Sequence, residues 1–137
     1  MIFPSKSKCI IHQRCIVSKE NHREHRAINV DGDRVFHYKI DGDIVPKSDP
    51  HARCDYLIED ETKNRLYLIE LKGTDVKRAV EQIEATIDLF ADKFQGIFYP
   101  RIIHRSNTHA IASSKVNKFK RKYPFNRFET NSFEEKI

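Results

Sequence analysis

The sequence CDYLIEDETKNRLYLIELKG, residues 54–73, holds two apolar runs separated by a polar stretch. The second run, residues 66–69, is continuously apolar, which is typical of a strand buried on both faces. We therefore expect strands over residues 54–58 and 65–72, joined by a turn over residues 59–64. In such an antiparallel pair, the start of the first strand lies beside the end of the second.

Three charged residues meet at one end of this expected hairpin. Asp55 opens the first strand, and Glu70 and Lys72 close the second. Because side chains alternate along a strand, Glu70 and Lys72 point to the same side, roughly 6–7 Å apart, while Leu71 points into the opposite, apolar side. The pattern predicts one site containing Asp55, Glu70 and Lys72. The alternative interpretation is an ordinary surface ion pair between Glu70 and Lys72.

The residues after Gly73 predict an amphipathic helix. Thr74 or Asp75 can cap its start. Apolar residues then recur at three- and four-residue spacings, namely Val76, Ala79, Val80, Ile83, Ile87 and Phe90. Gln82 lies beside this apolar stripe, from where its side chain could reach the site.

Two Asp-Gly turns, at residues 31–32 and 41–42, bracket residues 35–40, where apolar and polar side chains alternate as in a half-buried strand. The Asp-Gly-Asp repeats also invite a calcium-loop interpretation. Neither copy supplies the alternating oxygen ligands and the closing glutamate of an EF-hand, so hairpin turns are favoured.

The carboxyl-terminal half gives three further patterns. We expect a buried strand over residues 96–104, a short strand over residues 109–114 and a basic helix over residues 115–123 that Pro124 ends. The final residues, 125–137, are expected to form a loose tail.

The amino-terminal region is less regular. Residues 1–18 are expected to form an extended arm or a short strand, and residues 18–26 predict a short helix capped by Ser18. No segment looks like a linker between domains, so the sequence predicts a single domain over residues 1–137.

Composition limits the environment of the protein. No apolar stretch has the length of a membrane span, and polar and charged residues interrupt the first twenty positions where a signal peptide would lie. Three cysteines, Cys9, Cys15 and Cys54, are too few for a secreted disulfide framework. We therefore expect a soluble cytoplasmic protein. A zinc site at Cys9, His12 and Cys15 is disfavoured because no paired Cys/His set follows downstream.

The net charge of +5 is unevenly distributed, since residues 93–128 contain no Asp or Glu. This basic segment predicts contact with DNA phosphates. The proposed contacts are Lys115, Lys118, Lys120, Arg121 and Lys122. Phe119 and Tyr123 lie among them and could stack on bases. Their helical spacing with Val116 favours the alternative, that they belong to the core.

Hydrolysis of a phosphodiester requires a hard cation that neutralises phosphate charge and activates a water molecule. Carboxylate oxygens suit Mg²⁺, which typically takes only one or two protein carboxylates. Asp55 and Glu70 are the candidate ligands, and the Leu71 carbonyl is a third. Lys72 is placed to orient or deprotonate the water and to stabilise negative charge in the transition state. Mn²⁺ is expected to substitute for Mg²⁺.

Over residues 54–90 this arrangement resembles the restriction-endonuclease-like superfamily, which is named for its PD-(D/E)xK motif. Here Cys54 replaces the proline of the motif. The resemblance implies an α/β fold with a mixed central β-sheet flanked by helices and Mg²⁺-dependent DNA cleavage at Asp55, Glu70 and Lys72. Gln82 resembles a glutamine that several branches place in the helix after the lysine.

Other branches of this superfamily use an acidic residue from a preceding helix, for which Glu20 or Glu24 could stand. The expected function is a Mg²⁺-dependent DNA endonuclease. For a duplex target, one site per 16.2 kDa chain suggests a homodimer, because two strands need two cuts. The alternative is a non-catalytic DNA-binding or protein-interaction module on the same fold.

Overall fold

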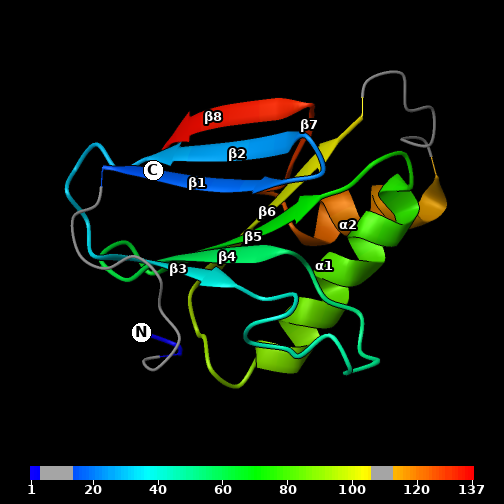
Figure 1. Ribbon diagram of the computed structural model, residues 1–137, viewed down its shortest axis with the longest axis horizontal. Coiled ribbons are helices and arrows are strands. Elements are labelled where there is room, and N and C mark those ends of the chain that lie inside the picture. The colour runs from blue at the N-terminus through cyan, green and yellow to red at the C-terminus, as the bar shows by residue number, and fades with distance from the viewer. Residues whose placement is uncertain (4–13, 106–112) are drawn as a thin grey trace.

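The computed structural model describes residues 1–3, 14–105 and 113–137. These residues form two β-sheets and two helices (Figure 1). The elements are β1 (Cys15–Glu20), β2 (Arg23–Ile28), β3 (Val35–Lys39), β4 (Tyr56–Asp60), β5 (Arg65–Leu71), α1 (Val76–Phe90), β6 (Ile97–His104), α2 (Ser114–Lys122), β7 (Arg127–Thr130) and β8 (Ser132–Lys136). Within the described residues, no helix has the length and apolar character needed to cross a membrane.

The larger sheet is mixed and has the strand order β3-β4-β5-β6-β7. Strands β3, β4 and β5 form an antiparallel meander, α1 crosses over, and β6 and β7 then add in parallel. The smaller sheet, in the order β1-β2-β8, covers one face of the larger sheet, and both helices cover the other (Figure 1). The expected mixed α/β class is confirmed. The expected sheet had helices on both faces, whereas here one face of the larger sheet is covered by the smaller sheet (Figure 1).

Strand β5 contributes to both apolar layers. Leu66 and Leu68 point into the core under the helices, whereas Tyr67 and Ile69 point into the core between the two sheets. This explains why residues 66–69 are continuously apolar, since a strand covered on both sides has no solvent-facing positions.

The expected hairpin of β4 and β5 is confirmed, with Tyr56 paired to Ile69. Its turn is shorter than predicted, because Glu59 and Asp60 continue β4 and are buried. Glu59 accepts hydrogen bonds from the Tyr38 hydroxyl at 3.0 Å and from the Ile2 N–H at 2.8 Å. These distant partners let a charged residue stay in a buried strand.

Two of the three expected helices, the one after Gly73 and the one over residues 115–123, are confirmed as α1 and α2. Asp75 caps α1 by accepting from the Arg78 N–H at 2.9 Å, and all six predicted apolar positions are buried. In α2, Val116 and Phe119 are fully buried, which confirms that they belong to the core. Residues 109–112 of the predicted short strand lie outside the described residues, and Ser113 caps α2.

The predicted helix over residues 18–26 is wrong. This segment is the hairpin of β1 and β2, whose two-residue turn, Asn21 and His22, has φ angles of 51° and 62°. Ser18 is buried and shares a hydrogen bond of 2.9 Å with His37 instead of capping a helix. In both strands every second residue faces inward, but some of these residues are polar, such as His25. The alternation of apolar and polar residues that indicates a half-buried strand is therefore missing from the sequence.

The predicted loose tail over residues 125–137 is also wrong, because it contains β7 and β8. Glu135 of β8 is held between Arg101, whose Nε lies 2.7 Å away, and His25, whose Nε2 lies 2.6 Å away. β8 pairs in parallel with β2, while β7 pairs with β6 of the larger sheet. The final residues therefore join the two sheets.

Candidate functional site

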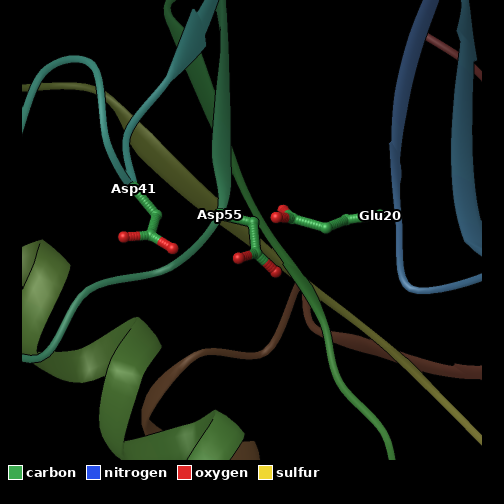
Figure 2. A group of neighbouring side chains, drawn as sticks. All are labelled: Glu20, Asp41 and Asp55. Carbon is green, nitrogen blue, oxygen red and sulfur yellow. The ribbon is translucent and has the colours of Figure 1, made fainter. Parts of the chain in front are cut away.

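Three acidic side chains converge beside the start of β4. One carboxylate oxygen from each of Glu20, Asp41 and Asp55 lies within 4.8 Å of the other two. Figure 2 shows these three side chains near one another. Glu20 ends β1, Asp41 follows β3, and Asp55 immediately precedes β4. Residues far apart in sequence, from both sheets, therefore form one acidic cluster.

The hairpin of β4 and β5 brings Glu70 to the same cluster. The Asp55 N–H donates to the Ile69 carbonyl at 3.0 Å, and the Asp55 carboxylate accepts from the Leu71 N–H at 2.8 Å. These two bonds hold the Asp55 carboxylate at the end of β5, close enough to the Glu70 carboxyl group for its charge to raise the pKa of Glu70. Glu70 is only 2% exposed. The structure thus brings Asp55 and Glu70 together, as the antiparallel geometry predicts.

The buried position of this cluster changes its acid–base properties. Burial and the neighbouring Asp55 charge raise the pKa of Glu70 to about 9, against an opposing effect of Lys72. Burial also raises the pKa of Asp55 to about 6, and the charges of Glu20 and Asp41 act in the same direction. Clustered carboxylates repel one another, and either a proton or a cation relieves that repulsion.

Several oxygens of the site have no hydrogen-bond partner among the described residues. They are Glu20 Oε2, Glu70 Oε1 and Gln82 Oε1, and all three are buried. A buried acceptor without a partner costs free energy, so such atoms require a specific explanation. Carboxylate oxygens are the ligands that Mg²⁺ prefers, so the cluster of Glu20, Asp41 and Asp55, with Glu70 beside Asp55, offers ligands that suit this cation.

Asp41 differs from the other carboxylates because cations of the protein already neutralise it. Its Oδ1 accepts from Arg53 at 3.0 Å and its Oδ2 from Lys47 at 2.9 Å. Arg53 also donates to the carbonyls of Asp49 and His51, which fixes the loop over residues 46–53 beside the cluster. We therefore place Asp41 at the edge of the candidate metal site.

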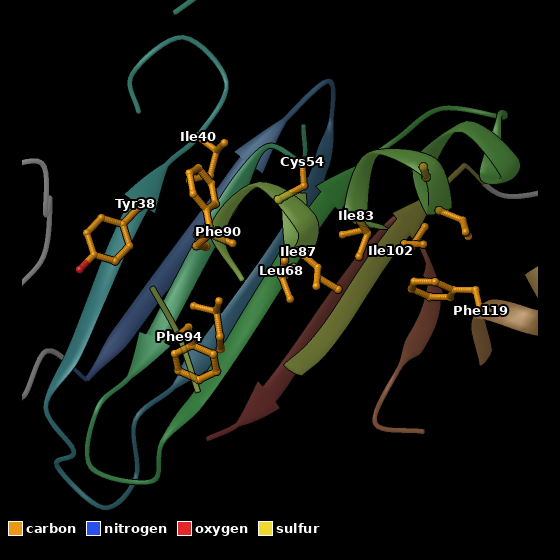
Figure 3. Close-up of a cluster of buried hydrophobic side chains, with 14 of the residues drawn as sticks. Tyr38, Ile40, Cys54, Leu68, Ile83, Ile87, Phe90, Phe94, Ile102 and Phe119 are labelled. Carbon is orange, nitrogen blue, oxygen red and sulfur yellow. The ribbon is translucent and has the colours of Figure 1, made fainter. Parts of the chain in front are cut away.

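The core fixes the two segments that carry Asp55 and Gln82. Cys54 and Ile83, their sequence neighbours, are both fully buried in the cluster between the larger sheet and the helices (Figure 3). Gln82 Nε2 donates to the Arg53 carbonyl at 3.2 Å. Gln82 also lines a small pocket of about 230 Å³ together with Asp41. Gln82 is thus placed next to the acidic cluster through the Arg53 loop.

Lys72 and Leu71 stand at the end of β5. The Lys72 N–H donates to the Ile103 carbonyl at 2.9 Å, which anchors this residue to β6. Its ammonium group is close enough to Glu70 to lower the pKa of that carboxyl group. The Leu71 N–H is used by Asp55, and a role for the Leu71 carbonyl as a ligand stays a prediction.

The structure distinguishes the two candidate additional acids. Glu20 belongs to the acidic cluster, whereas Glu24 lies on β2 and pairs with Arg26 at 3.3 Å. Glu20 comes from a strand rather than from the helix that the superfamily resemblance implied. Sequence reasoning missed Asp41 because the Asp-Gly-Asp repeat was tested only against an EF-hand calcium loop and then assigned to a hairpin turn. A signal was present, since antiparallel pairing of β3 and β4 places the end of β3 beside Asp55.

The basic helix α2 presents most of its predicted DNA contacts to one groove. This open groove, of about 750 Å³, lies between α1 and α2. The residues that line it are Glu84, Ser114, Lys115, Lys118, Phe119, Arg121 and Lys122. Lys115 pairs with Glu81 of α1 at 3.0 Å, and Lys120 lies outside the groove, over the Phe128 ring.

Comparisons with known proteins add no assignment to this geometry. No protein-family model matches the chain, and no curated protein or solved structure matches it. Any functional conclusion therefore has to be argued from the residues and their arrangement.

Proposed function

We propose that this protein is a Mg²⁺-dependent endodeoxyribonuclease that hydrolyses phosphodiester bonds. The observation that carries the proposal is the acidic cluster of Glu20, Asp41 and Asp55 from three separate segments, with Glu70 buried beside Asp55. Buried oxygens of Glu20 and Glu70 lack partners among the described residues. A surface ion pair of Glu70 with Lys72 does not account for this convergence, because Glu70 is buried against Asp55.

The carboxylates of Glu20, Asp55 and Glu70 would hold the cation, with the Leu71 carbonyl as a further candidate ligand. When bound, Mg²⁺ would neutralise charge on the phosphodiester and increase the acidity of a bound water molecule. Mn²⁺ is expected to replace it, because carboxylate and carbonyl oxygens suit both ions.

Two other side chains have roles in this proposal. Lys72 brings a positive charge to the same side of β5 as Glu70, where it would stabilise negative charge that develops on the phosphate. Gln82 is oriented by its bond to the Arg53 carbonyl, which leaves its buried Oε1 as an acceptor for the attacking water. The mixed sheet with a crossover helix after β5 supports a restriction-endonuclease-like core at the level of architecture.

DNA is the proposed substrate because of the basic helix α2. Residues 93–128 contain no Asp or Glu, and among the described residues Glu81 of α1 pairs with only one of the α2 cations, Lys115. Exposed lysine and arginine side chains bind phosphates independently of sequence. For a duplex target, one site per chain implies a homodimer.

The proposal is tested by isothermal titration of Mg²⁺ and Mn²⁺ into the wild-type protein and three variants, in parallel with a cleavage assay on linear duplex, single-stranded and branched DNA. Glu20→Gln and Glu70→Gln should lower metal affinity at least roughly 10-fold and abolish cleavage. Glu24→Gln is the matched control, because Glu24 lies in the same hairpin but outside the cluster. It should bind metal and cleave as the wild type does.

Absence of metal binding in the wild-type protein, even with DNA present, would contradict the proposal. Metal-independent DNA binding with a steep salt dependence would then favour the non-catalytic module.

A further inference from the structure

Three aromatic rings form a continuous stack along one face of the larger sheet. Tyr67 of β5 stacks on Tyr99 of β6, with ring centroids 4.9 Å apart and an interplanar angle of 29°. Tyr99 in turn stacks on Phe125, at 4.9 Å and 30°. Phe125 lies in the turn between α2 and β7, and the Arg101 guanidinium holds its carbonyl. The stack is therefore fixed to the sheet.

The stack ends at solvent. Phe125 packs one side of its ring against Tyr99, yet the residue remains 48% exposed. Among the exposed large apolar residues in the described part of the chain, Phe125 is the only aromatic one. An exposed ring held by a rigid stack loses little conformational entropy when another flat group stacks on it, so its open face suits an aromatic ligand.

A cationic side chain lies beside the middle ring of this stack, and others lie close to Phe125 in sequence. The guanidinium of Arg65 lies 5.2 Å from the centroid of the Tyr99 ring. The last turn of α2, which ends three residues before Phe125, contains Lys120, Arg121 and Lys122. A ligand that matches both features has flat aromatic groups joined by anionic groups. Single-stranded nucleic acid has this chemistry, whereas the bases of a duplex already stack on one another and hide their faces.

We propose that the Tyr67–Tyr99–Phe125 stack binds an unpaired base of single-stranded DNA and that the last turn of α2 contacts the adjacent phosphates. This inference names the substrate class and rests on the proposed function for the choice of DNA. Tyr67 precedes Glu70 by three residues, about 10 Å along β5, although the two side chains point to opposite faces of the sheet. The turn that carries Phe125 joins these faces around the β7 edge, so one strand can contact both regions.

The test measures binding in EDTA by fluorescence anisotropy of labelled oligonucleotides. The probes are oligothymidine of about 15 nucleotides, a duplex of the same length, and an abasic strand that keeps the sugar-phosphate backbone. Phe125→Ala should weaken binding of the single strand roughly 5- to 100-fold and leave the abasic strand and the duplex unchanged. Phe125→Tyr should retain the affinity, because it keeps the ring.

Two controls separate stacking from other effects. Leu89→Ala removes another exposed apolar side chain, 38% exposed on α1, and should leave every affinity unchanged. Arg121→Ala should weaken the oligothymidine and the abasic strand equally and reduce the salt dependence of both, because it removes a phosphate contact. Thermal unfolding establishes that each variant is folded.

The proposal is overturned if Phe125→Ala binds oligothymidine as the wild type does, if it weakens the abasic strand equally, or if the matching RNA strand binds ten-fold more tightly than DNA. Because EDTA removes the cation, these results are independent of cleavage. A protein that binds single strands but no Mg²⁺ would retain this inference and lose the nuclease proposal, and the converse result would do the opposite.

Discussion

Glu70 is the residue where function and stability conflict most directly. It is buried beside Asp55, and its Oε1 has no hydrogen-bond partner among the described residues. Its position followed from the sequence, because strand alternation places residues 70 and 72 on one side. The burial of Glu70 could not be predicted from the sequence. Glu20 lies near Glu70 only because residues 18–26 form the hairpin of β1 and β2, and the sequence of this segment indicated a helix.

This conflict gives a prediction for stability without metal. The pKa of Glu70 is about 9 in the folded protein, compared with 4.5 in the unfolded chain, so between these values the unfolded chain releases a proton that the folded protein keeps. The stabilisation that the protonated Glu70 side chain contributes to the folded protein is therefore complete below pH 4.5 and is lost as the pH rises toward 9. In EDTA at pH 8, Glu70→Gln should be more stable than the wild type by about 1–3 kcal/mol.

Urea unfolding at pH 4.5 and pH 8 measures this difference, which should be small at the lower pH. Glu24→Gln serves as the comparison and should show no gain at either pH. A Glu70→Gln protein less stable than the wild type at pH 8 would show that the charged carboxylate is favourable in the folded state.

At the scale of elements, the segments that local sequence specifies were predictable and the others were not. Helix α1 has a cap, a three- and four-residue apolar period and a polar face within one stretch. The hairpin of β4 and β5 has its turn between two apolar runs. By contrast, β8 is stabilised by His25, 110 residues away, and by Arg101, 34 residues away. No local pattern can reveal such partners.

The cap of α1 provides a prediction at this scale. Asp75→Ala removes the acceptor of the Arg78 N–H bond and should lower the free energy of unfolding by about 1 kcal/mol. Asp75→Asn keeps an oxygen acceptor and should lose little. Mg²⁺ affinity should be unchanged in both variants, because the core fixes the turn that carries Gln82. Urea unfolding and metal titration of the two variants check this, and a loss of metal affinity would mean that the helix start also positions the site.

At the scale of the whole molecule, the candidate site depends on how the two sheets pack. Glu20 belongs to the smaller sheet, whereas Asp55 and Glu70 belong to the larger one. The acidic cluster therefore forms only when the sheets are correctly placed. Glu135 links them, because it joins His25 of β2 to Arg101 of β6 through charged hydrogen bonds.

We therefore expect Glu135→Ala to affect both stability and metal binding. The substitution leaves the buried Arg101 without its carboxylate and should lower the free energy of unfolding by about 3 kcal/mol. Mg²⁺ affinity of the folded variant should also fall, because Glu20 is no longer held against Asp55.

Glu134→Ala is the matched control, since Glu134 is the neighbouring residue but its side chain is 66% exposed. Urea unfolding followed by titration under folding conditions separates the two effects. If Glu135→Ala loses stability and still binds Mg²⁺ with wild-type affinity, then the apolar core between the sheets is enough to hold Glu20 at the metal site without Glu135.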